Sequence, residues 1–187
     1  MIQQIVEAVA ESIRDVGYEE TRVEDVARQL TISKPTFYRY FESKDDVLTE
    51  IQIRMTEDWS IELESRLEAD VPFVETLRAL GQVVARDLLA DEPLFRVVHL
   101  HSAPQSGDRL RAAERRAERA LVRVIAAGQA RGDVATGYAP DLLGLIVESI
   151  LFTVSYAWAT RDISSHDLQD ALVGALLASY YGFASSD

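Results

Sequence analysis

The sequence predicts an all-α fold of about nine helices, and three observations support this prediction. Apolar residues recur at intervals of three and four, as in Ile2, Ile5, Val9 and Ile13, and this spacing gives a helix one apolar face. Stretches that alternate apolar and polar residues, as half-buried strands do, do not occur. Capping residues, glycine and proline divide the pattern into segments of helical length, and 187 residues are enough for one or two packed domains.

After a first helix over the apolar stripe from Ile2 to Val16, capping residues place two short helices and the start of a long one. Thr21 and Glu24 have the spacing of a capping box, in which each side chain bonds the backbone amide of the other residue. Ser33 is expected to cap a third helix, and Pro35 fits its first turn, where amides lack intrahelical partners. Ser43 begins another capping signal, from which a long helix is expected to run to about residue 69.

Five more helices are predicted in the rest of the chain. They are separated by stretches rich in proline, glycine and aspartate, which are typical of turns and helix ends. Their expected ranges are about 73–90, 93–102, 108–131, 140–161 and 165–183.

One of these segments has an alternative interpretation. Leu142–Ala159 is apolar enough to resemble a membrane span, but it contains Glu148 and several hydroxyl side chains, and the chain has no second such stretch. A helix surrounded by protein has the same composition, so no membrane association is expected. The chain has no cysteine, and its N-terminus lacks the basic and apolar blocks of a signal peptide, so a cytoplasmic location is expected.

The charge distribution leaves nucleic-acid binding open. The formal net charge is −12, which on its own argues against a polyanionic partner. Locally the balance is different, because residues 28–44 contain four basic residues and one acidic residue. The chain's two lysines, Lys34 and Lys44, both lie in this window. Local charge matters more than the sum for binding DNA, but a window this short is often basic by chance.

The same window contains two short predicted helices joined by a three-residue turn. This arrangement suits the major groove of DNA, because the first helix braces the second, which presents its N-terminal side chains to base edges. Val23–Leu48 reads VEDVARQLTISKPTFYRYFESKDDVL and closely resembles the DNA-binding domain of the TetR/AcrR family of regulators. One departure is Thr31, at a turn position where the family usually has glycine and where a β-branched residue poorly fits a left-handed backbone.

The resemblance implies a ligand-responsive transcriptional regulator rather than an enzyme. It implies a repressor that binds a near-palindromic operator in double-stranded DNA as a homodimer and is released by a small, largely apolar effector. The expected domains are a helix-turn-helix DNA-binding domain at 1–45 and a larger ligand-binding and dimerisation domain at 46–187. An all-helical enzyme is the alternative, but no catalytic residues stand out, and no cofactor is expected.

The resemblance also implies roles for single residues of the DNA-binding domain. Those implied to meet bases or the nearby backbone are Lys34, Pro35, Thr36 and Tyr38, and those implied to meet phosphates are Tyr40 and Lys44. Arg22 and Arg39 are further candidates for phosphate contacts. The alternative for Tyr38 and Tyr40 is that they only pack. A dimerisation module that has lost DNA binding is disfavoured, because the polar groups of Lys34, Thr36, Tyr38 and Lys44 are all present.

Two C-terminal helices are apolar on more than one face, which favours a dimer interface, as the resemblance also implies. The alternative is a core within one chain, although a lone helix pair should then have a polar outer face. The residues expected at the interface are Leu143, Ile146, Ile150, Val154, Leu168, Leu172, Ala175, Leu176 and Tyr180.

Aromatic and apolar residues of the central helices are candidates for an effector pocket, with plain core packing as the alternative. Glu148 is the acidic residue among them. Its carboxylate needs an ion pair with the arginine-rich stretch, an exposed position, or a ligand-binding role. The candidates are Trp59, Phe95, His99, Leu121, Glu148, Phe152 and Tyr156.

Two other patterns are expected to have no binding role. His99 and His101 are two residues apart, so on a helix they point to different faces, and no metal site is expected. An arginine-rich stretch mixed with glutamates is expected to be a solvated helix face stabilised by pairs four residues apart. Its arginines are Arg109, Arg111, Arg115, Arg116, Arg119 and Arg123.

Overall fold

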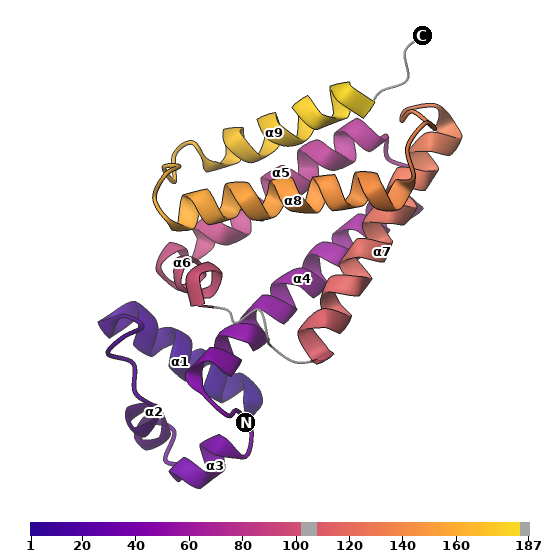
Figure 1. Cartoon of the computed structure of the whole chain (residues 1–187). Helices are drawn as coiled ribbons and strands as arrows, with labels where there is room; N and C mark the ends of the chain where they lie inside the picture. Colours follow the sequence, from indigo (N-terminus) through magenta and orange to yellow (C-terminus); the bar gives the residue numbers. More distant parts are fainter. Residues whose placement is uncertain (102–107, 184–187) are drawn as a thin grey trace.

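The chain folds into α-helices arranged in two parts, as a computed structural model shows (Figure 1). The structure describes residues 1–101 and 108–183, with the side chains of 108, 109 and 183 left undescribed. The described residues contain nine helices and no strand, which confirms the predicted fold class. The first four helices are α1 (Ile2–Val16), α2 (Val23–Gln29), α3 (Lys34–Tyr38) and α4 (Lys44–Glu68).

The remaining helices form the larger part of the molecule. In it α4 packs along α7, α5 packs against α9, and α8 crosses between them (Figure 1). α4 starts beside α3 and continues into the larger part, so one helix belongs to both. The ranges are α5 (Phe73–Ala90), α6 (Glu92–His101), α7 (Asp108–Arg131), α8 (Pro140–Ala159) and α9 (Leu168–Phe183).

Each part has its own hydrophobic core. In the smaller one, Ile5 of α1, Phe37 of α3 and Leu48 of α4 are fully buried together. Leu94 and Val98 of α6 belong to this same cluster, so α6 packs directly against the N-terminal helices. The larger core is formed by α4, α5, α7, α8 and α9. Each long helix has an apolar stripe because it packs against one or both of these cores.

The helix starts follow the predicted caps with one exception. Ser33 accepts a hydrogen bond from the Thr36 amide at 3.2 Å, and Ser43 and Asp46 form a complete capping box. The capping box predicted for Thr21 and Glu24 is wrong. Thr21 is buried and donates to the carbonyl oxygen of Gly17 at 2.8 Å, so its hydroxyl is satisfied by the preceding turn instead of by α2.

Part of the predicted dimer interface lies inside the protein's own core. Leu143, Leu168, Leu172 and Leu176 are at most 1% exposed, so their assignment to a partner contact is wrong. Both faces of α8 and α9 are apolar, and the spacing alone does not say which face turns inward. The other predicted members are half-buried: Ile146, Ile150, Val154, Ala175 and Tyr180.

A different stripe of α8 faces outward. Leu142, Leu145, Phe152 and Tyr156 are exposed and follow one another at helical spacing, on the opposite side from the buried Leu143 and its neighbours. Among the described helices, α8 alone is long and apolar enough to cross a membrane, with 33% of the relevant window buried. Core helices of soluble proteins also meet that criterion, so it is weak evidence for a membrane.

Candidate functional site

The turn between α2 and α3 has a defined geometry. Thr31 has φ +56°, the left-handed conformation that favours glycine, so the turn does not avoid positive φ and is strained at this β-branched residue. Its amide bonds the carbonyl oxygen of Arg28 at 3.1 Å, and the Ile32 amide bonds that of Ala27 at 2.9 Å. This pair of bonds is the Schellman ending of a helix. The turn therefore has a backbone conformation that favours glycine, with threonine at the left-handed position, at a conformational cost.

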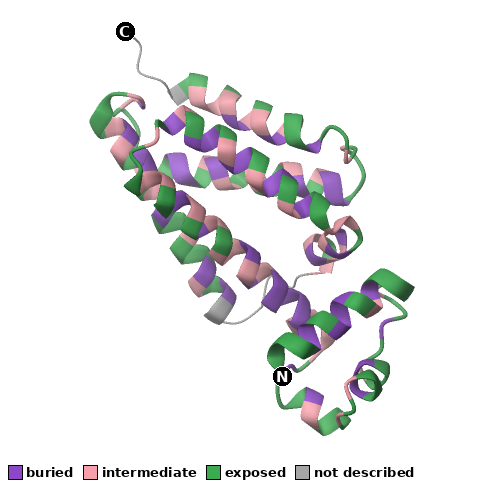
Figure 2. Ribbon diagram, turned by 180° about the vertical axis from the view of Figure 1, so that it is seen from behind, coloured by how far each residue is buried: buried purple, intermediate pink, exposed green. Residues whose placement is uncertain are grey.

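One buried side chain fixes the orientation of α3, so that the other side chains of this helix face outward. Phe37 is fully buried, and the T-shaped contact of its ring with Tyr38 has centroids 5.6 Å apart. Tyr38 is 49% exposed and Tyr40 37% exposed, so neither side chain is simply core. Exposed residues cover the outer sides of α2 and α3 (Figure 2). The predicted DNA-binding residues among them are Arg22, Lys34, Pro35, Tyr38, Arg39 and Tyr40, with Thr36 half-exposed.

Two of the cations on this surface already have partners. Lys34 forms an ion pair with Glu24 of α2, and its hydrogen bond lowers the pKa of that carboxyl. The Arg39 guanidinium lies 5.1 Å from the centroid of the Tyr40 ring. Both contacts are exposed to solvent, so replacing either of them with a contact to a phosphate or a base edge costs little free energy.

Lys44 is more firmly engaged than the prediction of a phosphate contact suggested. Its ammonium donates to the carbonyl oxygens of Tyr18 at 2.6 Å and Thr21 at 3.4 Å. Tyr18 in turn stacks on His101 of α6, with centroids 4.0 Å apart, and donates to Asp45. This cluster fixes the loop between α1 and α2 against α4 and α6. The sequence offered no indication of it, because its members are far apart in the chain.

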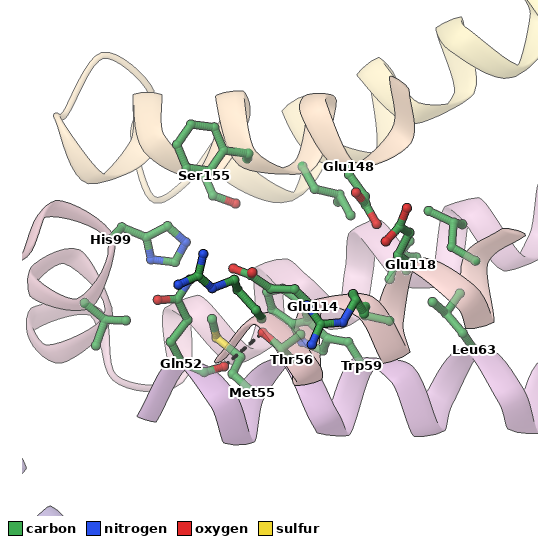
Figure 3. Close-up of a pocket in the computed structure, with 18 residues that line it drawn as sticks. Gln52, Met55, Thr56, Trp59, Leu63, His99, Glu114, Glu118, Glu148 and Ser155 are labelled. Carbon is green, nitrogen blue, oxygen red and sulfur yellow. Dashed lines mark hydrogen bonds between the residues drawn. The ribbon is translucent and has the colours of Figure 1, made fainter. Parts of the chain in front are cut away.

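The larger part contains a cavity of about 510 Å³ that is lined by residues of α4, α5, α6, α7 and α8 (Figure 3). Five of the seven predicted pocket residues line it: Trp59, His99, Leu121, Glu148 and Phe152. Phe95 and Tyr156 do not. Phe95 faces a second cavity of about 380 Å³ beside α1, and Tyr156 is exposed and stacks on Phe152 at 6.0 Å.

The arginine-rich stretch is exposed, as predicted, but part of it also lines the cavity. Arg111, Glu114, Arg115 and Glu118 line the cavity from α7. They lie three and four residues apart, and this spacing could have indicated that they share one side of the helix. Arg116 and Arg123 instead pair with Glu57 and Glu64 of α4, the latter at 3.4 Å. Arg109 lies outside the described side chains.

Glu148 points into the cavity toward Glu118 (Figure 3). Burial, followed by the charges of Glu118 and Glu114, raises the pKa of the Glu148 carboxyl. Among the described residues it forms no ion pair, so the predicted alternative of a bond to the α7 arginines is wrong. Burial also raises the pKa of Glu114, but there Arg111 and Arg115 oppose the shift.

Two further side chains line the cavity, His99 from α6 and Trp59 from α4. His99 projects into it, and Nδ1 lies 2.9 Å from the Phe95 carbonyl oxygen (Figure 3). Burial lowers the pKa of His99, which is therefore neutral at physiological pH. The indole Nε1 of Trp59 donates to Asp87 at 3.0 Å, so this polar group is satisfied on the α5 side. His99 and His101 point to different surroundings, as their spacing predicts.

Comparison with known proteins agrees with this architecture. Residues 5–51 match the family of bacterial regulatory proteins described as the tetR family. An uncharacterized HTH-type transcriptional regulator of Mycobacterium tuberculosis is 25% identical over 170 residues, covering 90% of this chain and 72% of that protein.

Solved structures share the fold over nearly the whole chain. The Thermus thermophilus FadR repressor, solved with lauroyl-CoA, has a TM-score of 0.79 at 21% identity, covering 100% of this chain and 97% of that one. FadR of Bacillus subtilis, solved with stearoyl-CoA, has a TM-score of 0.75 at 19% identity, with coverages of 95% and 98%.

A helix-turn-helix with an exposed second helix, followed by a larger helical part, defines a class of DNA-binding transcriptional regulators. Within that class the matched segment, residues 5–51, is that of the tetR family of bacterial regulatory proteins. The whole chain shares the fold of a TetR-family transcriptional repressor.

Proposed function

We propose that this protein is a ligand-responsive repressor, which binds a near-palindromic operator as a homodimer and is released by a small molecule. The observation that carries the proposal is one molecule that combines an exposed recognition helix with a cavity of about 510 Å³. Residues 1–45 would form the DNA-binding domain and residues 46–187 the ligand-binding and dimerisation domain. A regulator of this kind acts in the cytoplasm, where bacterial DNA is.

The proposed DNA-binding surface consists of α3 and its surroundings. The N-terminal part of α3 presents Lys34 and Thr36, which can donate to or accept from base edges in the major groove. Flanking cations and hydroxyls are suited to phosphates, which fix the position of the protein on the duplex. The complete set is Arg22, Lys34, Pro35, Thr36, Tyr38, Arg39, Tyr40 and Lys44.

The proposed dimer interface uses the outward faces of α8 and α9. The exposed residues Leu142, Leu145, Phe152 and Tyr156 form an apolar stripe on α8. On α9, Gly174 is exposed and leaves room for close approach of a second helix. Burial of such a stripe between two copies removes apolar surface from water. The half-buried Ile146, Ile150, Val154, Ala175 and Tyr180 lie beside it.

The proposed effector site is the cavity lined by Trp59, His99, Leu121, Glu148 and Phe152. Its volume and mixed lining are typical of a small-molecule site. Two proteins of this fold were solved with acyl-CoA ligands, which supports a ligand-binding role for the larger domain.

A route from the cavity to the DNA-binding domain runs along α6. His99 lines the cavity, whereas His101 on the same helix stacks on Tyr18. At the other end of α6, Asp91 pairs with Arg14 of α1 at 2.6 Å. A ligand that displaces α6 therefore acts on α1 and on the loop after it.

The test begins with selection of bound DNA from a random library, with affinity for the selected site then measured directly. We expect a two-fold symmetric sequence, since dimer symmetry imposes operator symmetry. Sedimentation of the free protein and of the complex gives the stoichiometry. A monomer that binds DNA with undiminished affinity, or an asymmetric selected site, would contradict the proposal.

A further inference from the structure

We propose that the effector has an apolar body and a positively charged group, and that Glu118 and Glu148 together bind the positive group. The inference rests on the proposed function, because it concerns the ligand of the same cavity. Its basis is the distribution of charge and apolar surface around the cavity walls.

The two carboxylates face each other across the cavity. Glu118 projects from α7 and Glu148 from α8, and the close-up view shows their oxygens directed toward one another (Figure 3). Neither forms an ion pair with another described residue. Two carboxylates that face each other without a cation repel, and a positive charge between them removes that repulsion.

The other charged groups of the cavity do not neutralise this pair. Arg111 and Arg115 act on Glu114, whose carboxyl they help to keep ionised. They are not among the charges that shift Glu148, on which Glu118 and Glu114 act. His99, from α6, is neutral at physiological pH. The Glu118–Glu148 end of the cavity is therefore its negative end.

The remaining walls suit the apolar part of such a ligand. Met55, Trp59 and Leu63 line the cavity from α4, and Leu121 and Phe152 add to this surface. Because the Trp59 N–H is bound to Asp87, the indole presents no free donor to the ligand. Aromatic rings attract cations as well as apolar groups, which favours an alkylammonium or aromatic ammonium ion.

A further acceptor in the cavity lacks a donor. Oε1 of Gln52 is buried and has no hydrogen-bond partner in the described part of the chain. A buried acceptor without a partner costs free energy, and a ligand that carries N–H or O–H groups would satisfy it. This observation is independent of the carboxylates, and it also points to a ligand that donates.

Three probes with one chain length separate charge from apolar burial. Decylammonium, decanol and decanoate are titrated by calorimetry at neutral pH, below their micelle concentrations. We expect the cation to bind about tenfold more tightly than decanol, and decanoate to bind more weakly than decanol. Equal binding of the three probes, tighter binding of decanoate, or no binding of the cation would overturn the inference.

Variants assign the effect to the two carboxylates. Glu148→Gln and Glu118→Gln should each lower the affinity for the cation by about tenfold. The affinity for decanol should change by less than about twofold. Glu148→Asp should retain the preference for the cation. Glu75→Gln, at an exposed position on α5 away from the cavity, is the matched control and should change neither. An unchanged preference in both glutamine variants would contradict the assignment.

Decanol binding reports an intact cavity, so a misfolded variant is recognised by losing all three probes. In that case the inference is tested by the preference of Glu148→Asp for the cation and by the affinities of the wild type for the three probes. DNA release is measured separately. If the cation binds with the expected selectivity but leaves the operator complex intact, the proposed function fails while the inference about the cavity holds.

Discussion

The ammonium of Lys44 lies 3.9 Å from the centroid of the Tyr18 ring and donates a hydrogen bond of 2.6 Å to the carbonyl oxygen of the same residue. A cation placed in this way contributes to the folded state before any DNA is present. Lys44 therefore has a structural role in the DNA-binding domain, and its proposed phosphate contact adds to that role.

Lys44→Ala should lower the free energy of unfolding by about 1–3 kcal/mol, because a charge-assisted hydrogen bond and a cation–π contact are both lost. Urea unfolding measures the change. Arg22→Ala removes an exposed cation nearby and should change stability by less than about 0.5 kcal/mol. The salt dependence of DNA affinity should become shallower in both variants. A Lys44→Ala protein of unchanged stability would mean that the residue acts on phosphate alone.

Thr36→Ala should alter preference at one or two base pairs by about 1–3 kcal/mol, with little effect on the salt dependence. On the proposed function the hydroxyl and methyl groups of Thr36 meet base edges, whereas phosphate contacts act on all sequences alike. Affinities on a panel of operator variants check this. Thr36→Ser keeps the hydroxyl that bonds Ser33 at 2.8 Å, so it controls for damage to the start of α3.

Thr31→Gly should raise the free energy of unfolding by about 0.5–1 kcal/mol, since glycine adopts φ +56° without the clash of a β-branched side chain. Thermal unfolding measures it. Thr160, at φ −80°, is the control position, and the same replacement there should bring no gain. If Thr31→Gly is less stable than the wild type, the side chain of Thr31 stabilises the turn in a way that outweighs its backbone strain.

Glu148→Gln should be more stable than the wild type at neutral pH. Burial and the nearby carboxylates of Glu114 and Glu118 raise the pKa of Glu148, so the folded protein binds this proton more tightly than the unfolded chain. Wild-type stability therefore falls as pH rises from the ordinary glutamate range through the raised pKa, and the glutamine variant lacks this loss. Arg111, Arg115 and His99 line the same cavity and are unchanged in the variant.

Melting curves across a pH series test this difference. The two proteins should converge below the ordinary pKa of glutamate, where Glu148 is protonated in both states. A glutamine variant that melts lower at neutral pH would mean that the charged carboxylate is stabilised by a partner.

Leu145→Glu should yield a folded monomer, because the side chain is 59% exposed in the single chain and lies on the proposed interface. Leu172→Glu should instead unfold the protein, since this side chain is fully buried and an unpaired charge in a core costs several kcal/mol. Sedimentation and circular dichroism distinguish the two outcomes. If the Leu145→Glu protein is still a dimer, α8 is not part of the interface.

The helix boundaries were predictable because local chemistry determines them. Ser33 and Ser43 cap their helices as expected, and the predicted range of 108–131 agrees with α7. The exposed surface of α3 was equally accessible, since Phe37 had to turn inward and its neighbours outward. The positive φ of Thr31 was not foreseeable, because a β-branched residue in this turn is compatible with either a strained left-handed backbone or a turn that avoids positive φ.

Choices that depend on tertiary packing were not predictable. α8 is apolar all round, so its spacing could not tell that Leu143 is buried and Leu142 exposed. Arg111 and Arg115 are exposed, as expected of a solvated face, but the packing of α7 between α4 and α8 also makes them line a cavity, which composition could not tell. The contact of Lys44 with Tyr18 joins residues 26 positions apart, beyond any local pattern.

Phe152 lines the cavity and also lies, 66% exposed, in the apolar stripe of α8. On the proposed function, one side chain then meets both the effector and the second subunit. Mutational adaptation to a new effector is constrained at such a position, since every replacement that reshapes the cavity also changes the surface at which the two subunits pair. Leu121 and Trp59 are away from that stripe, so descendants of this protein can diverge in effector preference there without altering the dimer.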